Sequence, residues 1–163
     1  MHVGTSISGL GFGGMAFYNS REGENTFIQF GSGYIGLPDQ HTSNIAGSGI
    51  VGSIIPMFIG TRYDFSVTRT RAFTWTQYAQ TGGGPLLGME YGNFNNFFQM
   101  FSKIGFRWGG GAYLGIGSEV RFNEGYAGFV QLEFDAFGFL SPLAGRSSYL
   151  GPSLAFGIQK LIW

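Results

Sequence analysis

Polar and apolar side chains alternate at every second position over much of this chain, most clearly between residues 113 and 137. This stretch reads YLGIGSEVRFNEGYAGFVQLEFDAF, and its charged and amide positions are Glu119, Arg121, Gln131, Glu133 and Asp135. Between them lie Leu114, Ile116, Val120, Phe122, Val130, Leu132 and Phe134. A period of two is that of a β-strand whose two faces meet different surroundings. The pattern therefore predicts strands and leaves open which face meets water.

The same alternation recurs in 27–34, 63–68, 86–92, 102–108 and 150–159. In each segment bulky apolar residues occupy one parity, and the other parity holds mostly small or amide residues with isolated charges of both signs. No helical period of 3.6 stands out, and a chain this rich in Gly, Phe and Thr is poor helix material. An apolar helix over 42–61 is the weaker alternative, because that segment contains glycines, serines and Pro56. The sequence thus predicts an all-β chain.

Clusters of Gly, Asn, Ser and Pro, among them 81–85 and 109–111, are typical of turns. The candidate strands between the clusters are 3–18, 25–37, 45–59, 62–79, 84–93, 97–109, 112–122, 126–139 and 149–163. Most are longer than the usual strand of about 5 to 6 residues and suit strands that cross a bilayer at a tilt. Because a single-chain bacterial barrel has an even number of strands, we expect eight. We expect the error to lie in 45–79, which lacks a clear turn.

Charge is too scarce for a polar face that meets water. Asp, Glu, Lys and Arg make up 11% of the residues, whereas aromatic residues make up 18% and glycine contributes 30 residues. Soluble domains average about 25% charged residues, and a soluble fold with so few would expose large apolar patches. Small residues beside isolated charges instead suit the narrow lumen of a small barrel. We therefore predict one domain over 1–163, a transmembrane antiparallel up-and-down β-barrel with eight strands.

This arrangement places the charged residues of the strands in the lumen and the bulky apolar residues against lipid. The predicted lumen network is Asp64, Glu90, Lys103, Arg107, Glu119, Arg121, Glu133 and Asp135. The residues expected to face lipid are Phe106, Trp108, Leu114, Ile116, Val120, Phe122, Val130, Leu132, Phe134 and Phe156. Five acids and three bases nearly balance, so mutual pairing compensates for their removal from water. We interpret the network as a plug that fixes strand register, in preference to a proton or ion pathway.

The chain ends in Leu161-Ile162-Trp163, an aromatic end to an amphipathic last segment. Together with the alternation, this pattern resembles the small eight-stranded β-barrel proteins of the bacterial outer membrane, although Lys160 falls on the apolar face. The resemblance implies a Gram-negative outer-membrane location, short periplasmic turns and longer outer loops. It also implies insertion by the barrel-assembly machinery. We expect membrane lipids and lipopolysaccharide as partners, with other outer-membrane proteins as a further option. We expect the signal peptide to have been removed, since residues 1–3 show neither a basic nor an apolar region.

The element His41-Thr42-Ser43-Asn44 is similar to the His-x-Ser-Asn element of outer-membrane lipid A deacylases, which are also eight-stranded barrels. In that family the histidine is the base and the serine is the nucleophile, which implies these roles for His41 and Ser43. Here the element lies early in the chain, Ile45 precedes Ala-Gly, and the next acid is only Asp64. A polar surface loop is the reading we favour.

Other site chemistries find little support. The chain has no cysteine, and its two histidines, His2 and His41, do not suggest a metal site; no cofactor is expected. Nine basic residues against nine acidic ones argue against nucleic acid. Arg69 and Arg71, which precede Phe73 and Trp75, are better interpreted as a membrane rim near lipid phosphates beside an aromatic girdle.

These observations predict a structural or accessory outer-membrane barrel, either an envelope component or a subunit of a larger outer-membrane complex. The alternative from the enzyme class is a lipid A-modifying barrel that uses His41 and Ser43. A narrow pore and a soluble barrel that holds an apolar ligand are further alternatives. The soluble barrel would require the bulky face to point inward.

Overall fold

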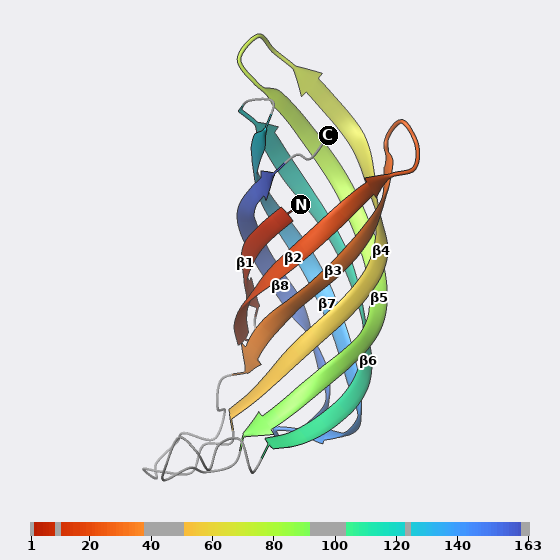
Figure 1. Ribbon diagram of the computed structural model, residues 1–163, viewed down its shortest axis with the longest axis vertical. Coiled ribbons are helices and arrows are strands. Elements are labelled where there is room, and N and C mark those ends of the chain that lie inside the picture. The colour runs from red at the N-terminus through yellow and green to blue at the C-terminus, as the bar shows by residue number, and fades with distance from the viewer. Residues whose placement is uncertain (1, 9–10, 38–50, 92–103, 123–124, 161–163) are drawn as a thin grey trace.

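The computed structural model describes residues 2–8, 11–37, 51–91, 104–122 and 125–160, and it consists of β-strands joined by turns (Figure 1). The strands are β1 (His2–Ser8), β2 (Gly11–Arg21), β3 (Thr26–Leu37), β4 (Val51–Arg69), β5 (Thr74–Tyr91), β6 (Ile104–Arg121), β7 (Tyr126–Leu143) and β8 (Arg146–Lys160). The predicted all-β, antiparallel up-and-down architecture is confirmed. Over the described ranges, no helix has the length and apolar character needed to cross a membrane.

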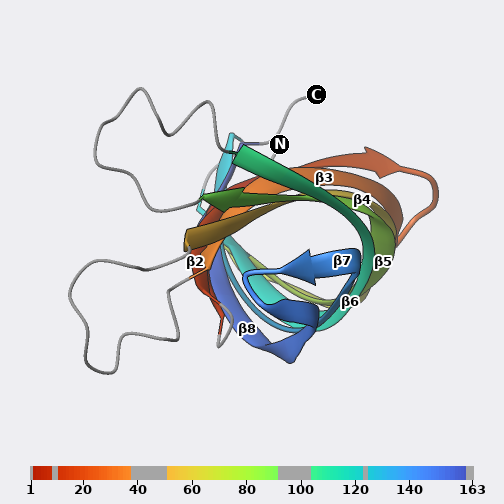
Figure 2. The ribbon, with the colours of Figure 1, turned by 90° about the horizontal axis from the view of Figure 1, so that it is seen from below.

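Every strand pairs with its neighbours in sequence, and β1 also pairs with β8, so the sheet closes on itself (Figures 1 and 2). Followed from His2, the register runs through Phe17, Gly31 and Phe58, then, at the level between the flanking pairs Pro56–Leu86 and Ile59–Gly83, through Gly84, Gly111, Phe137 and Tyr149. Ser153 pairs with Ser8, so Tyr149 is level with a point four positions beyond Ser8 in the direction of β1, and the register has shifted by ten residues after one circuit of the barrel. This stagger corresponds to a strand tilt of about 40° and a backbone radius of about 8 Å. Such a lumen holds side chains and little else.

Two of the predicted strand boundaries are wrong near the N-terminus and in the middle of the chain. The segment 3–18 is not one strand, because its two ends belong to β1 and β2, which pair with each other. β4 runs through the boundary predicted between 45–59 and 62–79, and the turn lies at residues 70–73. There the backbone N–H of Thr70 donates to the carbonyl oxygen of Phe73 at 2.9 Å. The sequence analysis missed this turn because residues 70–73 include no glycine or proline.

The glycine clusters at 81–85 and 109–111 were predicted as turns, and this prediction is wrong. Both clusters lie inside strands, so residues 84–91 of the predicted segment 84–93 belong to β5, and the segments 97–109 and 112–122 both contribute residues to β6. The two clusters also pair with each other, with Gly84 opposite Gly111. Glycine inside a strand marks a close approach of other groups as often as a turn.

The strand glycines leave space for aromatic rings in the lumen. A Cβ atom on Gly82 would lie 2.7 Å from Cε1 of Tyr113, and one on Gly31 would lie 2.5 Å from the ring of Phe17. These separations are far below van der Waals contact. Small residues on one strand therefore make room for large side chains that reach across from another strand.

An apolar cluster fills one half of the lumen, the half nearer the β7–β8 turn. It consists of Phe17, Ile35, Leu37, Ile54, Phe58, Leu86, Tyr113, Phe137, Phe139, Leu143 and Tyr149. Its rings pack at angles to one another; the centroids of Phe58 and Tyr113 are 5.2 Å apart. Burial of so many aromatic and aliphatic side chains is the main apolar contribution to stability.

The β7–β8 hairpin folds into the barrel mouth at this end, as the view along the barrel shows (Figure 2). Leu143 is fully buried there, and the hydroxyl of Tyr149 donates to its carbonyl oxygen. Ala144 and Gly145 both have positive φ angles, 48° and 79°, which produce the tight turn. The hairpin thus closes this mouth with an apolar side chain.

We expect Gly117→Ala to destabilise the barrel and Gly110→Ala to leave its stability nearly unchanged. A methyl group at position 117 would lie 2.3 Å from Cζ of the fully buried Tyr78, whereas the nearest atom to one at position 110, the carbonyl oxygen of Gly84, is 3.9 Å away. Overpacking of this kind costs about 1–3 kcal/mol. The measurement is the urea midpoint of unfolding in detergent micelles. Equal midpoints for the two variants would contradict the close packing.

Candidate functional site

Arg62 on β4 is the centre of a buried ion-pair cluster in the lumen. Its Nε donates to Oδ1 of Asp64 at 2.7 Å, and its Nη1 donates to Oε2 of Glu119 at 2.9 Å. The guanidinium carbon lies 3.8 Å from the ring centroid of Tyr78, a cation–π contact. Arg62 is 3% exposed and Glu119 is 2% exposed. A planar guanidinium suits this position because it pairs with two carboxylates and stacks on a ring at once.

A second arginine completes the charge balance of the cluster. Nη2 of Arg121 lies 3.9 Å from Oε1 of Glu119, a longer separation, and about a third of the Arg121 side chain is exposed. With Arg62 and Asp64 included, two positive and two negative charges share this part of the lumen. The cluster is therefore neutral as a unit, which lowers the cost of its removal from water.

Amide and hydroxyl side chains extend the cluster deeper into the lumen. The hydroxyl of Tyr78 donates to Oε1 of Gln131 at 2.9 Å, and Nε2 of Gln131 donates to Oε1 of Glu133 at 3.1 Å. Nε2 of Gln80 donates to the same oxygen of Glu133 at 2.5 Å. Two donors on one oxygen anchor this carboxyl group between β5 and β7.

The network continues to the opposite wall. Nε2 of Gln29 on β3 lies 3.3 Å from Oε1 of Gln80 and 3.1 Å from Oδ1 of Asn19 on β2, and donates to both. The hydroxyl of Tyr113 on β6 donates to Oε1 of Gln29 at 3.3 Å. Hydrogen bonds therefore link the strands from β2 to β7 across the lumen. A one-residue slip of any of these strands would point its polar side chains outward, so the network holds the register.

Glu133 and Asp135 lie where the polar network meets the apolar cluster. Both are buried, and with Tyr113 they line a cavity of about 10 Å³ that is otherwise bounded by apolar side chains, Phe17 and Phe58 among them. A cavity of this size has room for at most one water molecule. This part of the lumen is filled by side chains.

A separate ion pair lies at the mouth nearer the β7–β8 turn. Nη2 of Arg107 is 3.2 Å from Oε2 of Glu90, and both side chains are partly exposed. Nε of Arg107 donates to the carbonyl oxygen of Pro142 at 3.2 Å, which ties β6 to the β7–β8 hairpin. The apolar cluster separates this pair from the Arg62 cluster.

The structure divides the predicted lumen residues into groups. Asp64, Glu119 and Arg121 gather around Arg62; Glu133 and Asp135 lie deeper; Glu90 and Arg107 form the pair at the other mouth; Lys103 is outside the described residues. Instead of the single network that we expected, the lumen holds two polar regions separated by the apolar cluster. The sequence analysis did not predict this cluster, because its aromatic residues lie at lumen-facing positions that were assigned to no site.

Sequence reasoning missed Arg62, the central residue of the polar cluster. It lies two residues before Asp64, which was assigned to the lumen, and so faces the same side of the strand. The predicted strand began at residue 62, whereas β4 runs from Val51 to Arg69, so Arg62 was taken for the end of a strand. The amides Gln29, Gln80 and Gln131 were also left out of the network. In each strand these amides alternate with the bulky apolar residues and lie on the same face as the small residues. The alternation alone would therefore have assigned them to the lumen.

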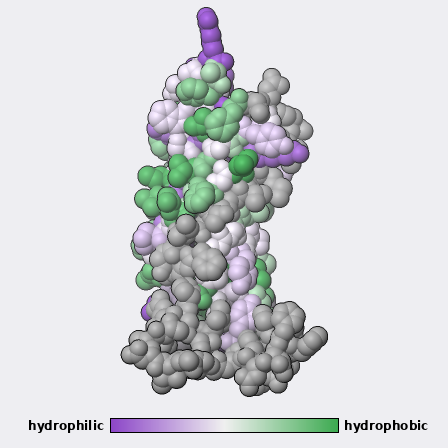
Figure 3. All heavy atoms as spheres, turned by 90° about the vertical axis from the view of Figure 1, so that its left-hand side faces the viewer, coloured by the Kyte–Doolittle hydropathy of each residue, from purple (hydrophilic) through white to green (hydrophobic). Residues whose placement is uncertain are grey.

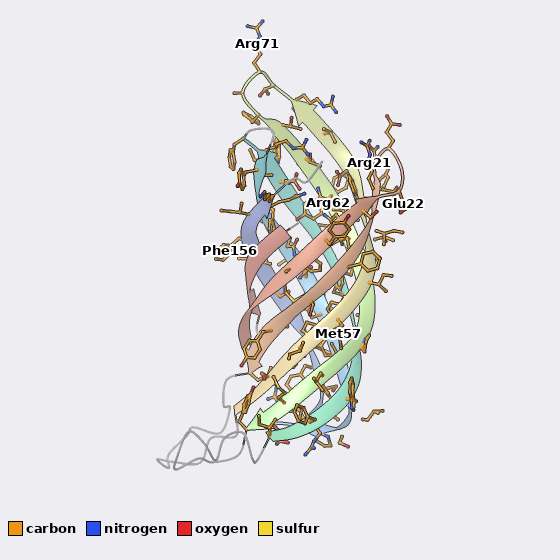
Figure 4. All side chains as sticks on the ribbon, viewed as in Figure 1. Arg21, Glu22, Met57, Arg62, Arg71 and Phe156 are labelled. Carbon is orange, nitrogen blue, oxygen red and sulfur yellow. The ribbon has the colours of Figure 1, made fainter. Side chains whose placement is uncertain are left out.

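The outer surface is apolar over the middle of the barrel. Of the ten residues predicted to face lipid, nine are exposed and Val120 is partly buried. Leu114, Ile116, Leu132 and Phe134 are each more than half exposed. In Figure 3, green apolar side chains gather on the upper half of the described surface and a purple side chain projects from its upper tip; Figure 4 shows Phe156 on the outside of the wall.

Charged residues of the described strands that lie outside the lumen clusters are confined to strand ends. They are Arg21, Arg69, Arg146 and Lys160. Every charged residue in a strand interior belongs to the lumen clusters described above. Strands of 18 residues, such as β5 to β7, give a barrel about 45 Å tall at this tilt, which leaves room for an apolar band of about 25 Å.

The remaining predicted site residues lie outside the part of the chain that the structure describes. These are His41 and Ser43, together with the C-terminal Trp163. Across the described ranges, no group of three or more His, Cys, Asp or Glu side chains is placed to hold a metal ion. Comparison with known proteins finds no matching family model, no similar curated protein and no similar solved structure.

We expect Arg62→Met to be strongly destabilising, because it leaves the carboxylates of Asp64 and Glu119 buried without their cation. Loss of one partner from a buried pair costs about 3–5 kcal/mol. Arg107→Met serves as the matched control, since its pair with Glu90 is partly exposed and is expected to contribute less than about 1 kcal/mol. The measurement is urea unfolding in micelles, followed by tryptophan fluorescence.

The triple variant Arg62→Met/Asp64→Asn/Glu119→Gln should recover much of the lost stability, because no uncompensated charge then remains in the lumen. Equal stability of the Arg62→Met and Arg107→Met variants would refute the central role of Arg62.

Proposed function

We propose that this protein is a small integral β-barrel of the bacterial outer membrane with a structural or accessory role. The proposal rests on the placement of polar and apolar side chains, which is the reverse of that in soluble proteins. The outer face is apolar and carries no charge over the middle of the barrel, whereas the ion pairs lie inside. An antiparallel sheet closed on itself leaves no unpaired edge, which is the requirement for strands that cross lipid. The resemblance to small outer-membrane barrels, drawn from the sequence pattern, supports the same location.

A soluble barrel with an apolar ligand fits the structure less well. Its bulky face would have to point inward, but large apolar side chains are exposed on β3 to β8. Soluble monomers rarely expose contiguous apolar patches larger than a few hundred Å². Among the described side chains, the polar network and the apolar cluster pack together around Glu133 and Asp135 and leave a cavity of about 10 Å³ there, too small for a ligand.

An orientation follows from the lengths of the connections. At the end that holds both termini, adjacent strands are separated by 22–25, 70–73 and 122–125; at the other end, 9–10 and 144–145 are short, whereas 38–50 and 92–103 are much longer than any connection at the first end. Outer-membrane barrels have short periplasmic turns and longer outer loops. We therefore place the termini toward the periplasm and the longer connections toward lipopolysaccharide. In a larger outer-membrane complex, partner proteins would contact the outer face or the two ends of the barrel.

The direct test is folding of the purified chain into lipid vesicles. The folded barrel should migrate differently from the boiled protein on SDS gels, and it should aggregate when detergent is removed without lipid. A chain that remains monomeric in buffer without detergent would overturn the membrane proposal.

A charged residue introduced on the outer face tests whether that face meets lipid or water. Leu132→Arg should impair folding into vesicles, because arginine on a lipid-facing position near the bilayer midplane costs about 2–4 kcal/mol. Thr68→Arg, on the exposed β4–β5 hairpin, adds the same side chain outside the apolar band and should fold like the parent. The readout is the folded fraction on unboiled gels. If water meets the outer face, both variants behave like the parent.

The packed lumen predicts a barrel that does not conduct ions. The parent protein in planar bilayers should show no stepwise conductance, because the Arg62 cluster and the apolar cluster lie in series along the lumen. Denatured protein added in the same amount of detergent is the control for bilayer damage. Regular conductance steps from the folded protein alone would favour the pore reading.

A further inference from the structure

The bulge in β4 turns Arg69 toward the lumen side of the barrel mouth, at the end that holds both termini. Before the bulge, the even positions of β4 face the lumen, as the buried ion pair of Arg62 with Asp64 shows. The register with β5 shifts between Asp64 and Ser66, so beyond the shift the odd positions of β4 face the lumen. Arg69 pairs there with Thr74, on the hairpin that projects furthest at this end (Figure 1). Arg69 therefore lies on the lumen face of the β4–β5 hairpin.

The same row of lumen positions continues from Thr74 to Arg121 on β6. Arg121 lies two residues after Glu119, which is buried in the lumen, and so faces the same side of the strand. Neighbouring strands are about 4.8 Å apart, so the Cα atoms of Arg69 and Arg121 are separated by about 10 Å, with Thr74 between them. Two arginine side chains on one face at this spacing reach a small ligand from both sides, and the threonine hydroxyl lies between them.

Arg121 keeps a buried N–H group without a partner. Its Nε is shielded from solvent and makes no hydrogen bond within the described part of the chain, although about a third of the side chain is exposed. Oε1 of Gln159 is also buried and unpartnered, and Gln159 lies on the same face two strands beyond Arg121, across Ala127. A buried donor that is left unpaired is destabilising, so an acceptor that reaches Nε from the mouth gains a hydrogen bond there.

Arg69 adds a positive charge that the ion-pair cluster beneath it does not compensate. The two acids and two bases of the Arg62 cluster already cancel one another. Arg69 is exposed and has no ion pair or hydrogen bond with another residue of the described ranges. The other carboxylates described at this end, those of Glu22 and Glu24, belong to the β2–β3 turn and make no ion pair with it. The row itself thus offers only cationic and hydroxyl groups.

We propose that this row binds a phosphate group, held between the guanidinium groups of Arg69 and Arg121 and beside the hydroxyl of Thr74. A guanidinium group presents its N–H donors in a fork that matches phosphate oxygens, and such charge-assisted hydrogen bonds are stronger than neutral ones. The site goes beyond the structural role proposed above, and in the proposed orientation it opens toward the periplasm. A soluble phosphomonoester and the headgroup of an anionic phospholipid both carry this group.

The experiment is a calorimetric titration of the full chain, folded in nonionic detergent micelles, with glycerol 1-phosphate. The parent should bind one ligand per barrel, and Arg69→Gln should weaken binding about tenfold, as expected for the loss of a charge-assisted hydrogen bond. Arg71→Gln is the matched control, because it removes the same charge at the hairpin tip, where Arg71 points away from the barrel (Figure 4), and should bind like the parent. Equal weakening in both variants would indicate a general effect of charge and would overturn the site.

A second pair of variants leaves the charge unchanged. Thr74→Val removes the hydroxyl group from the row and should weaken binding about fivefold. Thr68→Val makes the same change on the opposite face of the hairpin, where Thr68 pairs with Trp75, and should have no effect on binding. Binding by Thr74→Val at the affinity of the parent would contradict the placement of the phosphate in this row.

The source of the phosphate is identified in the same micelles by titration with phosphatidylglycerol in place of the soluble ligand. Binding of glycerol 1-phosphate that Arg69→Gln weakens assigns the site to a solute, whereas such binding of phosphatidylglycerol alone assigns it to a lipid headgroup. If the chain is folded on unboiled gels and binds neither, the site is refuted and the membrane proposal stands. A folded barrel that binds phosphate but does not insert into vesicles would overturn the membrane proposal alone.

Discussion

The narrowness of the lumen governs the rest of this structure. A closed eight-stranded sheet with a stagger of ten residues has a radius of about 8 Å, so opposite walls are within reach of each other's side chains. A large residue on one strand requires a small one on another, and this explains why glycines lie against the rings of Tyr78 and Tyr113. The same proximity allows the single side chain of Arg62 to join β4 to β6.

The division of the lumen into a polar half and an apolar half has separate physical consequences. The polar half fixes alignment, because ion pairs and amide hydrogen bonds depend on direction and fail after a slip of one residue. The apolar half contributes burial, which tolerates small rearrangements but excludes water. The two halves fill successive parts of the lumen along the barrel axis, and Glu133 and Asp135 lie at the boundary between them. The described interior is therefore packed with side chains in both halves.

How far the sequence predicted this structure depends on the kind of signal. Alternation placed Leu132 and Phe156 outside and Glu119 and Glu133 inside, because parity within a strand follows directly from its geometry. Strand boundaries failed where glycine was read as a turn, since sequence alone cannot distinguish a bend from a close approach to a ring. Arg62 was missed because its importance depends on Glu119, 57 residues away in the chain. Partners across the barrel are set by register, which local patterns do not encode.

The seam between β1 and β8 has a consequence for assembly. It extends over only the seven residues of β1, whereas β5 and β6 pair over 18 residues each. It also joins residues as far apart in sequence as His2 and Gln159, so its formation carries the largest loss of chain entropy of the strand pairs described. The hairpins can form locally, but this last pairing must wait until the others have brought the ends together. We therefore expect the β1–β8 seam to be the last strand pair to form during folding.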